Sequence, residues 1–234
     1  MPDAGPVPVP PLARAWYQVA VDALRDGDEV PDLGLPPAPA ALLLARGSAP
    51  ASVERLAGLD AYLLVRAESA PGAEALEANQ RALARARELA TERDGVVVDL
   101  GVPRVVEPEA PAGRAAGHWF VFAHDGALVD TWGLDRFGLP ELHCDQADDA
   151  RLPMYDAVLV GVAQRLLEEW PGHDPVGPAT VTLRDVARGY GDASAGGDDP
   201  TLDRGVDVTL AHDAAGRRLV VTLHDDPATA LFGP

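Results

Sequence analysis

Apolar residues near the start of the chain recur at helical spacing. Over residues 12–24 they follow one another at three- and four-residue steps, which places them on one stripe of a helix. Pro11 suits the first turn of a helix, where the missing amide N–H costs nothing, and Gly27 suits its end. The pattern predicts a helix between these two residues. The Pro-rich residues 1–10 are expected to form a disordered tail.

A strand–helix–strand unit follows a second Pro-rich stretch. Residues 30–40 contain four Pro and one Gly, which is typical of a linker. Residues 61–67 have the composition of a buried strand, residues 74–93 that of an amphipathic helix, and residues 96–98 that of a second strand. Crossovers of this kind usually join parallel strands.

The strongest local signal in the chain is a hairpin. Asp125-Gly126 lies between two strand-like runs, residues 118–124 and 127–133, and Asp-Gly favours a two-residue turn. Counting outward from that turn puts Phe122 opposite Val129 on an apolar face. The other face then carries Trp119 opposite Trp132, with Asp130 one step along.

The second half of the chain continues with alternating patterns. Residues 152–170 have helical spacing, residues 180–183 suit a strand, and residues 206–210 and 219–223 suit another hairpin. The element order predicts an α+β fold: a mixed, mostly antiparallel sheet with helices on one face, in a ferredoxin-like variant. Residues 59–234 are expected to form a single domain, with the helix and linker of residues 11–58 packed on its core.

Charge limits the classes of partner. The 234 residues include 37 Asp and Glu against 19 basic residues, all of them Arg, for a net charge of −18. Such a surface repels nucleic acid and anionic membranes. Residues 118–234, with 20 acids and 8 Arg, carry −12 of that charge, so a basic protein would be steered toward this half.

No catalytic or cofactor motif stands out. None of the four Ser lies in a Gly-x-Ser-x-Gly turn. Cys144 is the single Cys, which excludes an internal disulfide and a multi-cysteine zinc site. His118 and His124 are about 20 Å apart at strand rise. We therefore expect neither a metal nor a cofactor. Asp130 is the carboxylate of most interest, because it lies between aromatic residues that would desolvate it.

The segment after the hairpin resembles part of a family of uncharacterised bacterial α+β proteins. That family carries a Thr-x-Gly-Leu-x-Arg-Phe-Gly-Leu-Pro-Glu-Leu-like segment, and the matching residues here are Thr131, Gly133, Leu134, Arg136, Phe137, Gly138, Leu139, Pro140, Glu141 and Leu142. This chain has Trp132 where the family often shows His. The resemblance covers about residues 60–170 and implies the fold, since the family has no assigned activity. Arg136 and Glu141 would lie on an anchored loop, where binding groups are often found.

These patterns favour a non-enzymatic, cytoplasmic, acidic binding or accessory protein, similar to an immunity protein, for a basic protein partner. One alternative is an enzyme with a pocket near residues 118–142, and another is a small-ligand-binding module that uses the two Trp. The candidate binding residues are Trp119, Asp130, Trp132, Arg136, Glu141 and His143.

Overall fold

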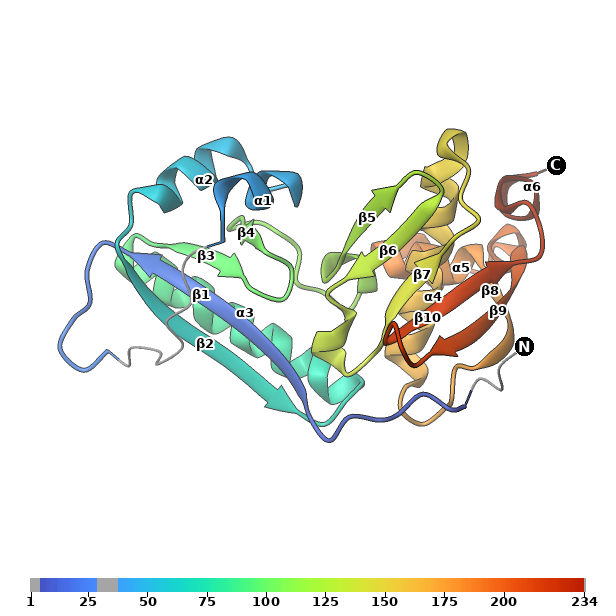
Figure 1. Ribbon diagram of the computed structural model, residues 1–234, viewed down its shortest axis with the longest axis horizontal. Coiled ribbons are helices and arrows are strands. Elements are labelled where there is room, and N and C mark those ends of the chain that lie inside the picture. Colours follow the sequence, from blue (N-terminus) through green and yellow to red (C-terminus); the bar gives the residue numbers. More distant parts are fainter. Residues whose placement is uncertain (1–4, 29–37, 234) are drawn as a thin grey trace.

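The computed structural model describes residues 5–28 and 38–233, so most of the expected linker at 30–40 lies outside the described residues. Two β-sheets lie side by side, each with helices packed against it (Figure 1). The expected N-terminal tail packs in part on the protein, since Val7 is buried in the core. Among the described residues, no helix is long and apolar enough to span a bilayer.

The first sheet has four strands in the order β2-β1-β3-β4. They are β1 (Ala13–Val21), β2 (Ala61–Ser69), β3 (Val96–Asp99) and β4 (Arg104–Val106), and each neighbouring pair is antiparallel. The helix α3 (Ala73–Arg93) connects β2 to β3. These two strands are parallel to each other, as the strand–helix–strand pattern predicted, but β1 lies between them.

The predicted N-terminal helix is wrong, because the same residues form β1. Tyr17, Val19 and Val21 are buried on the side of α3, whereas Gln18 and Ala20 are buried on the opposite side. A strand covered on both faces has no alternation of apolar and polar residues. Its apolar run therefore matched helical spacing by coincidence.

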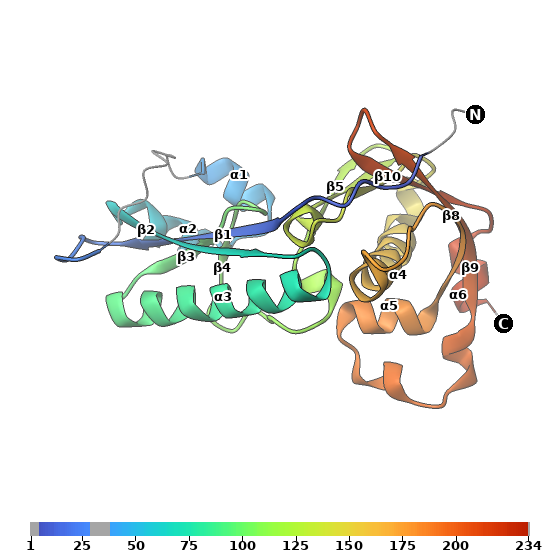
Figure 2. The ribbon, with the colours of Figure 1, turned by 90° about the horizontal axis from the view of Figure 1, so that it is seen from below.

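Helices cover both faces of the four-stranded sheet. The long helix α3 packs on one face, and α1 (Ala40–Ala45) and α2 (Pro50–Ala57) pack on the other (Figure 2). The layer between the sheet and the two short helices is a separate small core that includes Leu43, Val53, Leu56 and Val98. The α3 side belongs to a larger core that continues into the second sheet.

The second sheet has six strands in the order β5-β6-β7-β10-β9-β8. They are β5 (Val121–Asp125), β6 (Leu128–Trp132), β7 (Glu141–Cys144), β8 (Gly177–Thr182), β9 (Gly205–Asp213) and β10 (Arg218–Leu223). Only the β7–β10 pair is parallel. The helices α4 (Leu152–Glu169) and α5 (Leu183–Tyr190) pack on one side of this sheet, and α6 (Pro227–Phe232) follows β10 (Figure 2).

The predicted hairpin is present, with a different register. The loop residues are Gly126 and Ala127, so Asp125 pairs with Leu128 and Phe122 pairs with Thr131. Gly126 supplies the positive φ of 58° that this turn requires. The register differs from the expected one by two residues, which leaves the side chains within β5 and β6 on their expected faces.

The α+β class and the mostly antiparallel pairing are confirmed. The strands nevertheless divide between two sheets instead of forming one. The ferredoxin-like topology stays a prediction.

Candidate functional site

One side of the six-stranded sheet carries no helix in the part of the chain that the structure describes. The helices α4 and α5 pack on the opposite side (Figures 1 and 2). Because side chains alternate along a strand, residues of odd and even position point to different sides. The open sheet face consists of the outward side chains of these strands: Ala123, Asp125, Leu128, Asp130, Trp132, His143, Asp207, Thr209, Ala211, Asp213, Arg218, Val220 and Thr222.

A polar network crosses four strands in the middle of the open sheet face. His143 Nδ1 lies 2.7 Å from Asp130 Oδ1, and Arg218 Nη1 lies 3.2 Å from the same histidine nitrogen. Arg218 Nε donates to Asp213 Oδ2 at 3.2 Å. One ring nitrogen cannot donate to Asp130 and also accept from Arg218. Because the contact with Asp130 is the shorter one, we assign His143 Nδ1 as the donor to Asp130. Arg218 is then held by the carboxylates of Asp130 and Asp213.

The aspartate–histidine pair resembles the base of a catalytic triad, but the neighbouring Cys144 does not face it. Cys144 follows His143 in β7 and is buried on the other side of the sheet. Burial also raises the pKa of the Cys144 thiol above its ordinary value, which keeps it in the unreactive thiol form. The network is therefore better suited to hold a polar surface in place than to activate a nucleophile.

Trp132 lies at one end of the open sheet face, next to the first sheet. Its side chain is 48 % exposed. The Arg46 guanidinium, which follows α1 of the other sheet, lies over the ring at 4.7 Å from its centroid. This cation–π contact joins the two halves of the molecule and leaves part of a large aromatic side chain in solvent.

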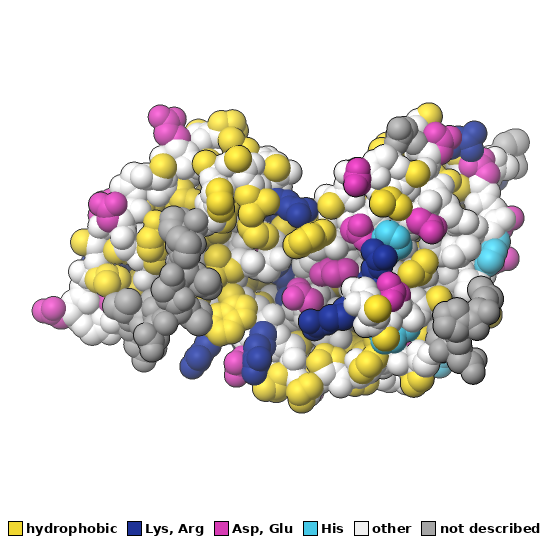
Figure 3. Space-filling view, in the orientation of Figure 1, with side chains coloured by type: hydrophobic (Ala, Val, Ile, Leu, Met, Phe, Trp, Pro, Cys, Tyr) yellow, Lys and Arg dark blue, Asp and Glu magenta, His cyan; other side chains and the backbone are white. Residues whose placement is uncertain are grey.

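Three exposed carboxylates lie toward the end of the open sheet face that is opposite Trp132. Asp125 ends β5, Asp145 follows β7 and Asp207 lies in β9, and all three are exposed. Acidic side chains gather with His and Arg on the half of the surface formed by the six-stranded sheet (Figure 3). The open sheet face thus combines negative charge with one exposed aromatic ring.

Arg136, expected as a binding group on a loop, lies in the interior. Its side chain is 1 % exposed, and its Nη2 donates to Asp99 Oδ1 at 2.7 Å. Nε donates to the Gly133 carbonyl at 3.0 Å. Burial alone would lower the pKa of Arg136, but Asp99 and Tyr17 more than offset this and raise it. Arg136 is therefore a charged structural residue that a ligand does not reach.

Glu141 is half-buried, and its carboxylate oxygens bind groups of the protein. Its Oε1 accepts hydrogen bonds from the amides of Gly133 and Leu134 at 2.7 and 3.0 Å, and its Oε2 accepts one from Thr131 Oγ1 at 2.7 Å. The carboxylate caps the N-terminus of the 3₁₀ helix Leu134–Phe137 by accepting from its first amides. Burial raises the pKa of Glu141 to about 7, so this group titrates near neutral pH.

Trp119 does not pair with Trp132, which corrects the expected aromatic pair. Trp119 precedes β5, is 2 % exposed and packs edge-on against Phe137 at 6.2 Å between ring centroids. Its Nε1 donates to the Gly113 carbonyl at 2.9 Å. The strand predicted from residue 118 starts only at Val121, because a short 3₁₀ turn directs the preceding residues into the core.

The structure thus divides the six expected site residues into two groups. Asp130, Trp132 and His143 share the open sheet face, although His143 is only 7 % exposed. Trp119 and Arg136 lie in the interior, and the half-buried Glu141 is bound to backbone amides. Sequence reasoning missed Arg218, Asp213 and Arg46. The Arg218–Asp213 pair could have been found by counting across the last hairpin. The contact between Arg218 and His143 could not have been found in this way, because it depends on the pairing of β7 with β10, which lie far apart in the sequence.

The cavities of the molecule lie away from the expected site residues. Among the described residues, no group of three or more His, Cys, Asp and Glu could hold a metal ion. One cavity of about 500 Å³ lies between α4 and β8, and another of about 360 Å³ lies beside α2, α3 and β4. Neither is lined by any of the six expected site residues.

Comparison with known proteins gives no relative for this arrangement. No protein-family model matches the chain, and no curated protein or solved structure does so either.

Proposed function

We propose that this chain is a non-enzymatic, acidic binding protein that takes a basic protein partner on the open sheet face. The observation that carries the proposal is one side of the six-stranded sheet that has no helix on it among the described residues. This side holds an ordered polar network, three exposed aspartates toward one end and a half-exposed Trp132 toward the other. A cytoplasmic accessory role, similar to that of an immunity protein, is the setting in which we expect this activity.

Electrostatics supports a basic partner. The open sheet face carries Asp125, Asp130, Asp207 and Asp213 against Arg218. Acidic surfaces raise the association rate of cationic proteins, and salt weakens this effect. The partner would gain most of its affinity where solvent is excluded, and exposed tryptophans commonly supply that contact.

The distribution of the candidate residues favours binding over acid–base catalysis. An enzyme with its pocket at residues 118–142 would need Asp130, Arg136 and Glu141 to face one substrate. Arg136 is instead buried against Asp99, and the half-buried Glu141 is bound to backbone amides. The remaining pair, Asp130 and His143, lies on a sheet surface.

The test compares two triple variants with the same change in net charge. The first carries Asp125→Asn, Asp145→Asn and Asp207→Asn around the open sheet face. The matched control carries Glu74→Gln, Glu77→Gln and Glu92→Gln, all exposed on α3. The wild-type chain is used to isolate partners from a bacterial lysate, and the identified partner is then titrated against all three proteins by calorimetry at low and moderate salt.

We expect a basic partner whose affinity falls about tenfold or more in the first variant and about twofold or less in the control, since each tenfold step corresponds to about 1.4 kcal/mol. Replacing Trp132 by Ala should also weaken the complex. An equal loss in both triple variants would show that only overall charge matters. A neutral or acidic partner, or no partner, would overturn the proposal.

A further inference from the structure

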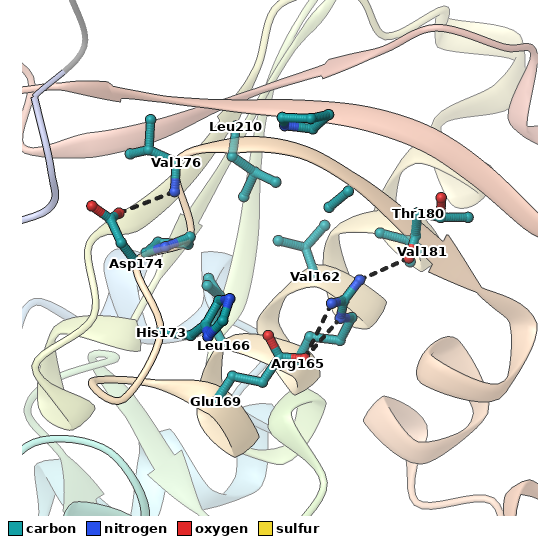
Figure 4. Close-up of a pocket in the computed structure, with 13 residues that line it drawn as sticks. Val162, Arg165, Leu166, Glu169, His173, Asp174, Val176, Thr180, Val181 and Leu210 are labelled. Carbon is teal, nitrogen blue, oxygen red and sulfur yellow. Dashed lines mark hydrogen bonds and ion pairs between the residues drawn. The ribbon is translucent and has the colours of Figure 1, made fainter.

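The larger of the two cavities has the size of a small-molecule site. Its volume of about 500 Å³ lies between the C-terminal half of α4 and the edge strand β8, under the segment that connects them (Figure 4). Sites for small ligands generally measure about 300–1,000 Å³ and combine apolar walls with a few polar groups. The cavity is separate from the open sheet face and was not signalled by any sequence motif.

The lining is mixed: the base of the cavity has apolar side chains that are almost fully buried, and the mouth is charged. Val162 and Leu166 of α4 and Leu210 of β9 form part of the apolar wall. Figure 4 shows Arg165 and Glu169 at one side of the hollow and Asp174 at another, with His173 between them. A ligand that fills this space would therefore need an apolar body and a polar end.

Hydrogen bonding decides which charge that polar end should have. Arg165 Nε and Nη2 both contact Glu169 Oε1 at 3.1 Å, and Nη1 donates to the Thr180 carbonyl at 2.8 Å. Each of the three guanidinium nitrogens thus makes one hydrogen bond to the protein, and the charge of Arg165 is paired with that of Glu169. Asp174 uses only Oδ1, which accepts from the Val176 amide at 3.1 Å. In the described structure, Glu169 Oε2 and Asp174 Oδ2 accept no hydrogen bond from the protein, so the mouth favours a cation.

The edge of the sheet argues for a compact ligand over an extended peptide. Pro178 has no amide N–H to offer an added strand. Arg165 occupies the Thr180 carbonyl, and the Thr182 amide donates to Asp185 Oδ2 at 2.9 Å. These contacts leave few main-chain groups for strand addition along β8.

We propose that this cavity binds a small organic cation: an amine whose hydrocarbon part packs on Val162, Leu166 and Leu210 and whose ammonium group faces Glu169 and Asp174. This site is independent of the proposed protein partner. It can be tested without knowledge of either the partner or the natural ligand.

The experiment uses three probes that share a phenyl body: 2-phenylethylammonium, 2-phenylethanol and 3-phenylpropionate. Binding to the full chain is followed by NMR through the amides of Val176, Ala179 and Val181. The test variant is Glu169→Gln with Asp174→Asn, in which both amide side chains keep an oxygen acceptor. The matched control is Asp125→Asn with Asp145→Asn, which removes the same charge away from the cavity. A third variant, Ala179→Phe, fills the cavity, since Ala179 lines it.

We expect the ammonium probe to bind about three- to tenfold more tightly than the alcohol, the range for partly solvated ion pairs, and the carboxylate probe to bind most weakly. The test variant should lose this preference and keep its affinity for the alcohol, while the control should keep both. Ala179→Phe should abolish binding of all probes.

Two results would contradict the proposal. Equal binding of the three probes would overturn the ligand class, and unchanged cavity amides with every probe would overturn the site. Because the charge variants change only exposed residues, they decide between these outcomes even where Ala179→Phe fails to fold.

Discussion

Asp99 and Arg136 form a buried ion pair at the junction of the two sheets. Asp99 ends β3 of the four-stranded sheet, and Arg136 lies in the 3₁₀ helix between β6 and β7, with 2.7 Å between Oδ1 and Nη2. The same Oδ1 accepts the amides of Gly101 and Val102 at 3.0 and 3.2 Å. The pair thus fixes the turn after β3 and the loop after β6 in one geometry.

Breaking this pair should destabilise the protein strongly. Arg136→Met removes the cation and leaves Asp99 charged and buried, which costs about 3–5 kcal/mol in comparable pairs. Urea denaturation measures the free energy of unfolding directly. Glu68→Gln is the control, because it breaks an exposed pair with Arg14 at 3.2 Å, and such pairs contribute about 1 kcal/mol or less. A similar loss in both variants would contradict the structural role of Arg136.

Glu141 should make stability depend on pH. Burial raises the pKa of Glu141 in the folded protein to about 7, from 4.5 for an ordinary glutamate. The folded state therefore holds this proton more tightly than the unfolded state. The contribution of Glu141 is complete below pH 4.5 and is lost as the pH rises through 7.

The measurement compares the free energy of unfolding of the wild-type chain and Glu141→Gln at about pH 5 and about pH 8, on either side of the folded-state pKa. The wild-type chain should lose more stability between the two pH values than the variant, which has no proton to release. Glu77→Gln, on the exposed side of α3, should follow the wild-type curve. Parallel curves for the wild-type chain and Glu141→Gln would show that Glu141 keeps an ordinary affinity for its proton.

Trp132 should account for most of the tryptophan fluorescence that acrylamide can quench. Of the four Trp, Trp119 and Trp170 are 2 % and 4 % exposed and Trp16 is half-buried, whereas Trp132 is 48 % exposed. Trp132→Phe should therefore remove most of the quenchable emission. The substitution should lower the free energy of unfolding by about 1 kcal/mol or less, as for other exposed cation–π contacts. Trp119→Phe is the control: it should keep the quenchable emission and destabilise the core. Unchanged quenching in Trp132→Phe would place its ring out of solvent.

Gly161→Ala should destabilise the protein although alanine is the better helix former. Gly161 lies inside α4, and an added Cβ would approach Val181 Cγ1 to 2.6 Å and Val186 Cγ2 to 3.2 Å. Both contacts involve packed β-branched side chains that have little room to move, and overpacking of this kind costs about 1–3 kcal/mol. Gly196→Ala, where no atom lies within 4 Å of the added Cβ, should change stability by about 0.5 kcal/mol or less. A gain in stability from Gly161→Ala would show that α4 and β8 are less closely packed than these distances indicate.

Long amphipathic elements were predictable from the sequence because each carries its own pattern. The helices at residues 73–93 and 152–169 and the two hairpins follow from periodicity and turn residues alone. β1 was not predictable, because burial on both faces removed the alternation that identifies a strand. The short strand β7 was not predicted, because its four residues lie in a polar segment and carry no recognisable alternation. Its pairing with β10 involves residues far away in the sequence.

Half of the candidate site could be predicted for a similar reason. Asp130 and Trp132 lie on one strand, so alternation placed them on one face. The inward positions of Arg136 and Glu141 depend on Asp99 and on the amides after β6. Contacts between segments so far apart are set by tertiary packing, which no local spacing reports.

The central place of β1 in the four-stranded sheet has a consequence for assembly. Its two neighbours, β2 and β3, do not pair with each other, and Tyr17 pairs with Asp99 near the far end of the first hundred residues. β1 can therefore complete its pairing only after β3, which lies about 80 residues later in the sequence, has reached it. Such long loop closures slow folding, and a version shortened past residue 21 would leave two strands with no common neighbour to join them.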